Sequence, residues 1–186
     1  MKYFLKIKQM ITTKKDNTNK NLNKQPVIAI FDDIPQMDAI SQDIWGEEGK
    51  YSLNFYSSVL SQNLSYVFKE KNGEVTAFCL ARYEYKADRV GIYLFCVKKS
   101  YQGKGLGKAL LSFCLDNCRK KGLKNFYLHT AVTNYPAINL YMKLGFRVTE
   151  TILNYYCNDP KPHNDAFLMS IKEDDNRLGQ NSIKLN

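Results

Sequence analysis

Long apolar runs, paired cysteines and histidines are all scarce in this sequence of 186 residues. It has no run of about 18 consecutive apolar residues, so no segment has the composition of a membrane-spanning helix. The five cysteines form no Cys-x-x-Cys pair, and no histidine adjoins Cys114 and Cys118, which are one helical turn apart. Structural zinc sites take Cys and His ligands in sets of about four. We therefore expect no metal and mostly buried, reduced thiols in a cytoplasmic protein, with a nuclear location left open.

Acidic residues are nearly absent from the first 25 positions. Residues 1–25 hold seven lysines and a single acid, Asp16, and so carry six of the nine net positive charges of the chain. We predict a flexible basic extension over residues 1–25, one folded domain over residues 26–172 and a polar tail over residues 173–186. The extension is either a solvated tail or a contact for the ribosome or an auxiliary subunit.

Short β-type runs alternate with amphipathic helical segments along the rest of the chain. Strands are expected at residues 27–31, 65–68, 75–85, 90–97, 126–130, 146–153 and 166–171. Helices are expected at residues 35–45, 55–60, 108–118 and 134–144, with a proline in the first turn of the first and the last. The Asn72-Gly73 pair favours a type I′ hairpin between two of the strands. The pattern predicts a mixed α/β sheet.

The most informative segment is the glycine-rich stretch that joins the strand ending at Val97 to the helix starting near Lys108. Glycines let backbone N–H groups approach a ligand closely, and a helix N-terminus carries partial positive charge. These features favour a pyrophosphate, with a purely structural turn as the alternative. A Walker A loop is excluded because Gln102 stands where its first glycine belongs. A Rossmann loop is excluded because Lys108 or Leu110 stands where its third glycine belongs.

Two motifs resemble those of the GCN5-related N-acetyltransferase (GNAT) family. The stretch from Gln102 to Gly107 (QGKGLG) resembles the family's acetyl-CoA loop, and the stretch from Asn134 to Phe146 resembles its N-x-x-A-x-x-x-Y-x-k-x-G-F segment. The resemblance covers residues 27–171. It implies a single α/β GNAT domain with a mixed, mostly antiparallel seven-stranded sheet, a central splayed pair of parallel strands and four helices. It also implies acetyl-CoA as the co-substrate.

The resemblance further implies which residues hold acetyl-CoA. The pantetheine arm is expected along the backbone of Phe95, Cys96 and Val97, with Asn134 as a further contact. Tyr141 matches the family tyrosine that hydrogen-bonds the CoA sulfur and can protonate the departing thiolate, although a core tyrosine is the alternative. The diphosphate is expected on the loop and the first helical turn, at Gln102, Gly103, Lys104, Gly105, Leu106, Gly107 and Lys108.

Acetyl transfer to an amine needs a group that accepts the amine proton. The Tyr-Leu-His triplet ending at His129 resembles that of protein Nα-acetyltransferases, in which the matching histidine serves as general base, often through water. A satisfied core histidine is the alternative. Those enzymes place a tyrosine on the preceding strand, where this chain has Gly91. Because strand side chains alternate, Tyr93 points to the same face and is the candidate replacement, unless it is only a packed aromatic.

Two segments are expected to wall the acceptor site. Tyr155 and Tyr156 resemble the tyrosine pair that holds the substrate peptide backbone in the Nα-acetyltransferases. The loop between the first two helices would form the opposite wall, where acidic side chains either attract a cationic amine or are simply solvated. The residues of this second wall are Ile44, Trp45, Gly46, Glu47 and Glu48.

Three functions remain open. The Tyr-Leu-His strand and the tyrosine pair favour acetylation of the α-amine at a peptide or protein N-terminus. The glycine at position 91 and the acidic pair Glu47-Glu48 keep open the acetylation of lysine side chains or of small amines such as polyamines. A non-catalytic, acyl-CoA-binding subunit of a larger assembly is the third.

Overall fold

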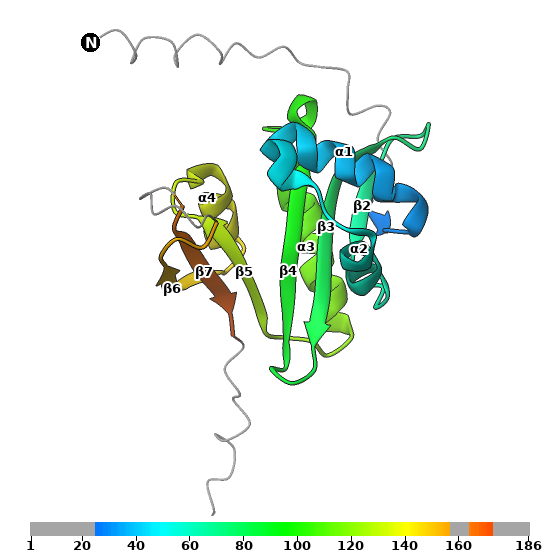
Figure 1. Ribbon diagram of the computed structural model, residues 1–186. Helices are drawn as coiled ribbons and strands as arrows, with labels where there is room; N and C mark the ends of the chain where they lie inside the picture. Colours follow the sequence, from blue (N-terminus) through cyan, green and yellow to red (C-terminus); the bar gives the residue numbers. More distant parts are fainter. Residues whose placement is uncertain (1–24, 157–163, 173–186) are drawn as a thin grey trace, which may run out of the picture.

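A mixed β-sheet with helices on both faces forms the described part of the computed structural model, residues 25–156 and 164–172 (Figure 1). Its seven strands are β1 (Val27–Ile28), β2 (Tyr66–Lys69), β3 (Val75–Glu84), β4 (Arg89–Val97), β5 (Phe126–Ala131), β6 (Arg147–Ile152) and β7 (Ala166–Ile171). Their order is β1-β2-β3-β4-β5-β7-β6, and every neighbouring pair is antiparallel except β4 and β5. The predicted seven-stranded, mostly antiparallel sheet is confirmed.

Four α-helices in this part of the chain cover the sheet: α1 (Ile34–Trp45), α2 (Leu53–Leu60), α3 (Leu106–Lys120) and α4 (Tyr135–Lys143). Local chemistry sets their starts. A proline lies in the first turn of α1 and of α4, and the Ser52 hydroxyl accepts the Phe55 N–H at the start of α2. Short 3-10 turns lie at Phe31–Asp33, Gly46–Gly49 and Lys99–Tyr101. Among the described helices, none combines the length and apolar character needed to cross a bilayer.

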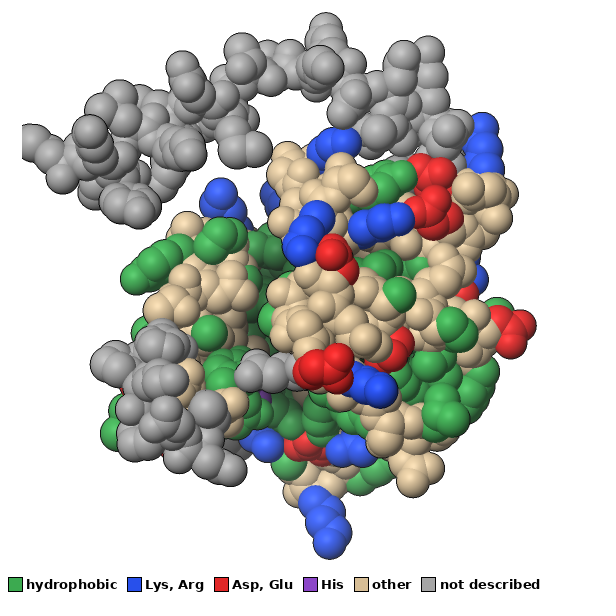
Figure 2. All heavy atoms as spheres, turned by 45° about the horizontal axis from the view of Figure 1, so that its top comes forward, with side chains coloured by type: hydrophobic (Ala, Val, Ile, Leu, Met, Phe, Trp, Pro, Cys, Tyr) green, Lys and Arg blue, Asp and Glu red, His purple; other side chains and the backbone are tan. Residues whose placement is uncertain are grey.

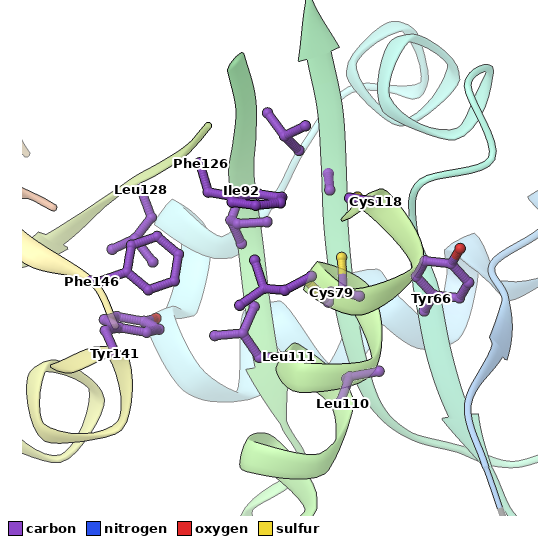
Figure 3. Packing of buried hydrophobic residues seen from close by; sticks show 14 of the residues in the cluster. Tyr66, Cys79, Ile92, Leu110, Leu111, Cys118, Phe126, Leu128, Tyr141 and Phe146 are labelled. Carbon is purple, nitrogen blue, oxygen red and sulfur yellow. The ribbon is translucent and has the colours of Figure 1, made fainter. Parts of the chain in front are cut away.

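The core has two parts, one on each face of the sheet. On one face, α3 and α4 pack on the strands through residues such as Leu111 and Tyr141 (Figure 3). On the other face, α1 and α2 contribute Met37 and Val59. The central strands therefore carry apolar side chains on both faces. Four cysteines are buried and free, as expected of reduced thiols: Cys79, Cys96, Cys114 and Cys118.

The first strand is shorter than predicted. A strand was expected over residues 27–31, but β1 ends at Ile28 and a 3-10 turn begins at Phe31. The carboxylate of Asp33 accepts the N–H of Ile30 at 3.1 Å, and this hydrogen bond turns the chain out of the sheet toward α1.

The hairpin between β2 and β3 is not the predicted type I′ turn. A type I′ turn needs a positive φ at both central residues. Gly73 has a φ of 88°, but Asn72 is not among the residues with a positive φ. The Gly73 N–H donates to the Glu70 carbonyl at 3.0 Å, so the chain makes a longer turn that ends in a left-handed glycine.

The parallel strands β4 and β5 separate after a short stretch of pairing. The pairs are Val90 with Phe126, Gly91 with Tyr127 and Ile92 with Leu128. Beyond Ile92, β4 continues beside β3 and β5 continues beside β7, and the two strands diverge (Figure 1). The β3–β4 register also shifts here and leaves Tyr93 as the extra residue of a β-bulge. The predicted splayed pair is therefore confirmed, and it leaves the second half of β4 unpaired on the side of β5.

Some predictions fall on residues that the structure does not describe. Of the basic extension predicted over residues 1–25, only Gln25 is described. The polar tail predicted over residues 173–186 lies wholly outside the described residues. The predicted boundaries of the folded domain, at residues 26 and 172, therefore stay predictions.

Candidate active site

The glycine loop lies between the end of β4 and the start of α3. Gly103 and Gly105 have φ of 74° and 83°, in the left-handed region that glycine enters at little cost. Gly105 is the N-cap of α3 and has no side chain to cap the helix. Because the first amides of a helix have no intrahelical partner, the N–H groups of this first turn can bind an anion. Gln102 holds the loop to β4, since its Nε2 donates to the Val97 carbonyl oxygen at 2.9 Å.

Gly107, in the first turn of α3, lies against both β4 and α4. A Cβ at this position would lie 3.2 Å from Cζ of Phe95 and 3.5 Å from Cγ2 of Val97 and Cδ2 of Leu140. Glycine therefore brings the start of α3 close to the unpaired part of β4. The residues present fit CoA, because an anion-binding helix start and an unpaired backbone edge meet at the same end of the splayed gap.

Two lysines add positive charge at the loop. Lys108 is exposed on the first turn of α3, and Nζ of Lys104 lies 5.6 Å from the centre of the Tyr101 ring. The Tyr101 hydroxyl donates to Glu70, and this hydrogen bond together with burial raises the pKa of Tyr101 to about 12. The loop thus offers ammonium groups as well as backbone amides to a diphosphate.

His129 lies on β5, on the face of the sheet opposite α3 and α4. Its neighbour Leu128 packs into the α3 side of the core, so alternation turns His129 the other way. The Tyr155 ring stacks on the imidazole with centroids 4.5 Å apart, and the Tyr127 ring meets it edge-on at 5.8 Å. Burial, followed by the charge of Arg89, lowers the pKa of His129 below its ordinary value of 6.5. The imidazole is therefore neutral at neutral pH and can accept a proton.

Tyr141 lies on α4, across the sheet from His129. Its ring centre is 6.2 Å from that of Phe95 on β4 and 6.0 Å from that of Phe146, which precedes β6 (Figure 3). Burial raises the pKa of Tyr141, so the phenol keeps its proton at neutral pH. The protonated phenol of Tyr141 and the neutral imidazole of His129 thus belong to opposite faces of the sheet where β4 and β5 part.

Tyr93 lies at the β4 bulge, on the face of α1 and α2. Its hydroxyl donates to Oε1 of Glu84 at 2.5 Å and accepts from Nη2 of Arg82 at 2.9 Å. Its ring packs edge-on against Phe55 of α2, with centroids 6.3 Å apart. The hydroxyl is therefore fixed on the His129 face of the sheet, and its part in catalysis stays a prediction.

Sequence reasoning missed the charged network around Tyr93. Oε2 of Glu84 accepts from Nε of Arg89 at 3.0 Å, and the Tyr127 hydroxyl also donates to Glu84. Burial is the largest single effect on the pKa of Glu84 and raises it, but hydrogen bonds from Tyr127, Tyr93 and Arg89 together outweigh burial and lower it. Tyr127 could have been found, because it alternates with His129 on the same strand. Glu84 and Arg89 flank a hairpin and belong to no motif.

Asn134 is the N-cap of α4. Its Oδ1 accepts the Ala137 N–H at 3.4 Å, so its side chain has a structural part in starting the helix. Contact with the pantetheine arm stays a prediction for this residue.

The two predicted walls of the acceptor site belong to the end of α1 and to the turn after β6. Trp45 ends α1 rather than lying in a loop, and Gly46 follows it with a φ of 66°. Glu47 is exposed in the 3-10 turn that comes next. Tyr155 and Tyr156 follow β6, are partly exposed and contact each other edge-on at 4.9 Å. Figure 2 shows the surface hollowed between the half with α1 and α2 and the half with α4.

A cavity of about 450 Å³ lies beside Tyr127, at the start of β5. Side chains from four strands and the adjoining turns line it, among them those of Arg89, Tyr127, Glu150 and Ser170. Tyr127 and Ser170 are paired in the β5–β7 register, so the cavity lies on the strands that also carry His129. This cavity lies on the same face of the sheet as His129, but His129 is not among the residues that line it.

The chain matches the sequence model of the acetyltransferase (GNAT) family over residues 30–146. With this match, and with the splayed strands and the glycine loop in place, the chain belongs to the GNAT family.

Several relatives are named as N-acetyltransferases. The [ribosomal protein bS18]-alanine N-acetyltransferase of Escherichia coli (strain K12) is 32% identical over 101 residues, which are 54% of this chain and 66% of that protein, just under two thirds of its length. N-alpha-acetyltransferase 50 of Danio rerio is 31% identical over 127 residues, 66% of this chain and 74% of that protein. The structure of Arabidopsis thaliana Naa50 in complex with the bisubstrate analogue CoA-Ac-MVNAL superimposes with a TM-score of 0.68, at 25% identity over 82% of this chain and 99% of that one. The predicted similarity to Nα-acetyltransferases is confirmed.

Proposed function

We propose that the chain is an acetyl-CoA-dependent N-acetyltransferase whose acceptor is the α-amine of a peptide or protein N-terminus. The observation that carries the proposal is the pair of proton-transfer groups at the splayed strands. His129, with a lowered pKa, lies on one face of the sheet, and Tyr141, with a raised pKa, lies on the other. The names of the relatives support the acceptor class.

Acetyl-CoA supplies the acetyl group as a thioester. The first-turn amides of α3, with Lys104 and Lys108, would bind its diphosphate, and the unpaired backbone of Phe95 to Val97 would bind its pantetheine arm. Glycine at position 107 keeps these two parts close. The helix start and the strand edge thereby set where the thioester lies in the gap.

The acceptor amine has to lose a proton as its nitrogen bonds to the acetyl carbon. The neutral imidazole of His129 takes this proton, directly or through water. As the carbon–sulfur bond breaks, the sulfur gains electrons and benefits from a proton, which the Tyr141 hydroxyl can donate. Transfer of one proton at each end leaves an amide, a free thiol and, after proton exchange with water, the resting side chains.

The acceptor site is proposed between the end of α1 and the turn after β6. Tyr155 and Tyr156 present aromatic surface and hydroxyl groups to a peptide backbone, and Trp45 forms the opposite wall with Gly46. Exposed Glu47 would attract a cationic N-terminus.

The test is a set of matched peptides incubated with acetyl-CoA and the full chain. Peptides with a free N-terminus are expected to gain one acetyl group by mass spectrometry, and the same peptides with a blocked N-terminus to gain none. His129→Ala is the activity control, and it should retain CoA binding. Acetylation of lysine in the blocked peptides would reject the N-terminal proposal.

Gly91 and Glu47 favour a second acceptor class, lysine side chains or small amines. The strand tyrosine of the Nα-acetyltransferases is absent at position 91, and an exposed carboxylate at the site suits a second cationic group. Acetylation of a polyamine in the same assay would support this class.

We also propose a cellular location for the protein and a partner for its basic N-terminal residues. A cytoplasmic location, where N-termini emerge during synthesis, fits four buried free thiols. The lysines of residues 1–25 favour contact with ribosomal RNA or an acidic auxiliary subunit.

A further inference from the structure

Gly91 and Tyr127 are partners across the parallel pair of β4 and β5. A Cβ at position 91 would lie 2.9 Å from Cε1, Cζ and Oη of Tyr127, closer than real Cβ atoms come to other atoms. The outer half of the Tyr127 ring therefore lies across β4, over the α-carbon of Gly91. No side chain can be accommodated at position 91 while the Tyr127 ring keeps this position.

The hydroxyl of Tyr127 is fixed by its neighbours. It donates to Oε1 of Glu84, the same oxygen that accepts the Tyr93 hydroxyl at 2.5 Å, and the two phenolic oxygens are 3.4 Å apart. Arg89 holds the other oxygen of Glu84, and its guanidinium carbon lies 4.0 Å from the centre of the Tyr127 ring. Tyr127 thus joins the two strands on the face that carries His129.

The same ring also bounds His129. The imidazole contacts two rings: Tyr155, stacked on it at 4.5 Å and 16°, and Tyr127, in a T-shaped arrangement at 5.8 Å and 86°. Tyr127 is buried and His129 is half-buried, so removing the Tyr127 ring would expose the imidazole to water.

We infer that Tyr127 is a positioning residue of this site: its ring, admitted by Gly91, orients His129, and its hydroxyl, through Glu84, orients Tyr93. The inference rests on the proposed function, for which it supplies an arrangement of the acceptor side that does not need a side chain at position 91. Glycine at this position is then a requirement of the site, because it makes room for a tyrosine carried by the neighbouring strand.

The first test measures the His129 imidazole directly by NMR titration of the full chain without substrate. The chain has two histidines, so His129→Gln assigns the signals. Charged groups that act on the His129 pKa come from three strands: Glu84 on β3, Arg89 on β4 and Glu150 on β6. Because burial is the largest cause of the lowered pKa, Tyr127→Ala is expected to raise the His129 pKa toward 6.5. An unchanged titration would overturn the inference, and this readout does not depend on any acetylation activity.

The second test asks whether Gly91 acts through Tyr127. Gly91→Ala displaces the ring and should lower kcat/KM for a free N-terminal peptide by about a hundredfold, the scale for a misplaced reacting group. In a Tyr127→Ala background, the same Gly91→Ala change should have little further effect, because no ring remains to be displaced. Equal effects in both backgrounds would contradict the inference.

Tyr127→Phe separates the hydroxyl from the ring and avoids the risk of a misfolded variant. It should leave the His129 titration unchanged and lower kcat/KM by about tenfold, since one hydrogen bond to a charged group is lost. The matched control is Tyr83→Phe, which removes a hydroxyl that donates a hydrogen bond to Oδ1 of Asp88 at 2.7 Å, outside the site. It should change neither the His129 titration nor kcat/KM. Unchanged kinetics in Tyr127→Phe would overturn the role of the hydroxyl. If instead the unaltered chain has no activity but the titrations are as expected, only the proposed function is contradicted.

Discussion

His129 owes its chemistry to where β5 places it rather than to its residue type alone. An imidazole in water has a pKa near 6.5 and is partly protonated close to neutral pH. Here burial, and then Arg89, lower that pKa, while the rings of Tyr155 and Tyr127 both contact the imidazole. The side chain is thus kept in the form that accepts a proton, with an aromatic ring stacked on it.

The pH dependence of activity follows from this lowered pKa. Below its pKa His129 is protonated and cannot act as a base, so kcat/KM is expected to fall as the pH drops through a value below 6.5. Measurement of kcat/KM between about pH 5 and pH 9 checks this, with His129→Ala as the control. The α-amine of the free substrate titrates at about pH 8 and adds its own limb there. A profile that shows no further fall below pH 6.5 would contradict the assignment.

The same shift affects stability. A depressed folded-state pKa means that the unfolded chain binds the proton more tightly, so the contribution of His129 to stability is present above pH 6.5 and is lost as the pH falls through the folded pKa. The buried phenols do not titrate in this range, since burial raises the pKa of Tyr141 and of Tyr127.

Tyr141→Phe tests the proton donor at the opposite face. The substitution removes only a hydroxyl from a well-packed ring, so the fold and CoA binding should persist. The expected result is a fall in kcat of about 10- to 100-fold, at the lower end of the range for general acid catalysis, with KM for acetyl-CoA nearly unchanged. Steady-state kinetics with a thiol-detecting assay measures both constants. An unchanged kcat would show that the leaving sulfur takes its proton from elsewhere.

The type and order of most helices and strands could be predicted from local sequence. Amphipathic periodicity, the two first-turn prolines and the glycine loop are local signals, and the elements they predicted are present in the expected order. The β4 bulge at Tyr93 and the placement of Tyr127 over Gly91 could not be predicted, because both depend on register between strands. Strand register is set by side-chain packing across the sheet, which one sequence does not reveal.

The hairpin at Gly73 shows the same limit on a smaller scale. The Asn-Gly pair favours two left-handed residues, but the Glu70 carbonyl and the β2–β3 register selected a longer turn with a single left-handed glycine. The glycine was identified correctly and the turn type was wrong.

The start of α3 is the element that the CoA proposal depends on, and two glycines provide a matched test. Gly105 at the helix start and Gly73 in the hairpin have φ of 83° and 88°, and a Cβ at either would meet nothing within 4 Å. Alanine at either position should therefore cost about 1–2 kcal/mol of stability from backbone strain. Only Gly105→Ala should weaken CoA binding, measured by calorimetry, because it disturbs the anion site. Equal CoA affinities in the two variants would contradict a diphosphate site at this loop.

At the scale of the whole molecule, the sheet is two units joined by a short parallel seam. The strands from β1 to β4 carry α1, α2 and α3, while β5, β7 and β6 carry α4, and direct pairing between the units is limited to three residue pairs of β4 and β5 (Figure 1). A ligand that lies in the gap and contacts both units should therefore stabilise the molecule.

Thermal unfolding of the full chain tests this coupling. A ligand at one hundred times its Kd adds about 2.7 kcal/mol of stability, which for a domain of this size raises Tm by roughly 5–10 °C. CoA is expected to produce this shift, and pantetheine, which lacks the diphosphate, a much smaller one. High salt should reduce the shift, since Lys104 and Lys108 contribute by charge. Equal shifts from CoA and pantetheine would contradict binding at the helix start.

The most direct measurement is a crystal structure of the full chain with a conjugate that links CoA through an acetyl group to the N-terminus of a peptide. The account predicts that the sulfur lies between β4 and β5 and that the acceptor nitrogen lies about 3 Å from the His129 imidazole or from one water bound to it. The peptide should leave the site between Trp45 and Tyr155. A conjugate whose acceptor nitrogen lay out of reach of His129, or whose diphosphate lay away from the start of α3, would contradict it.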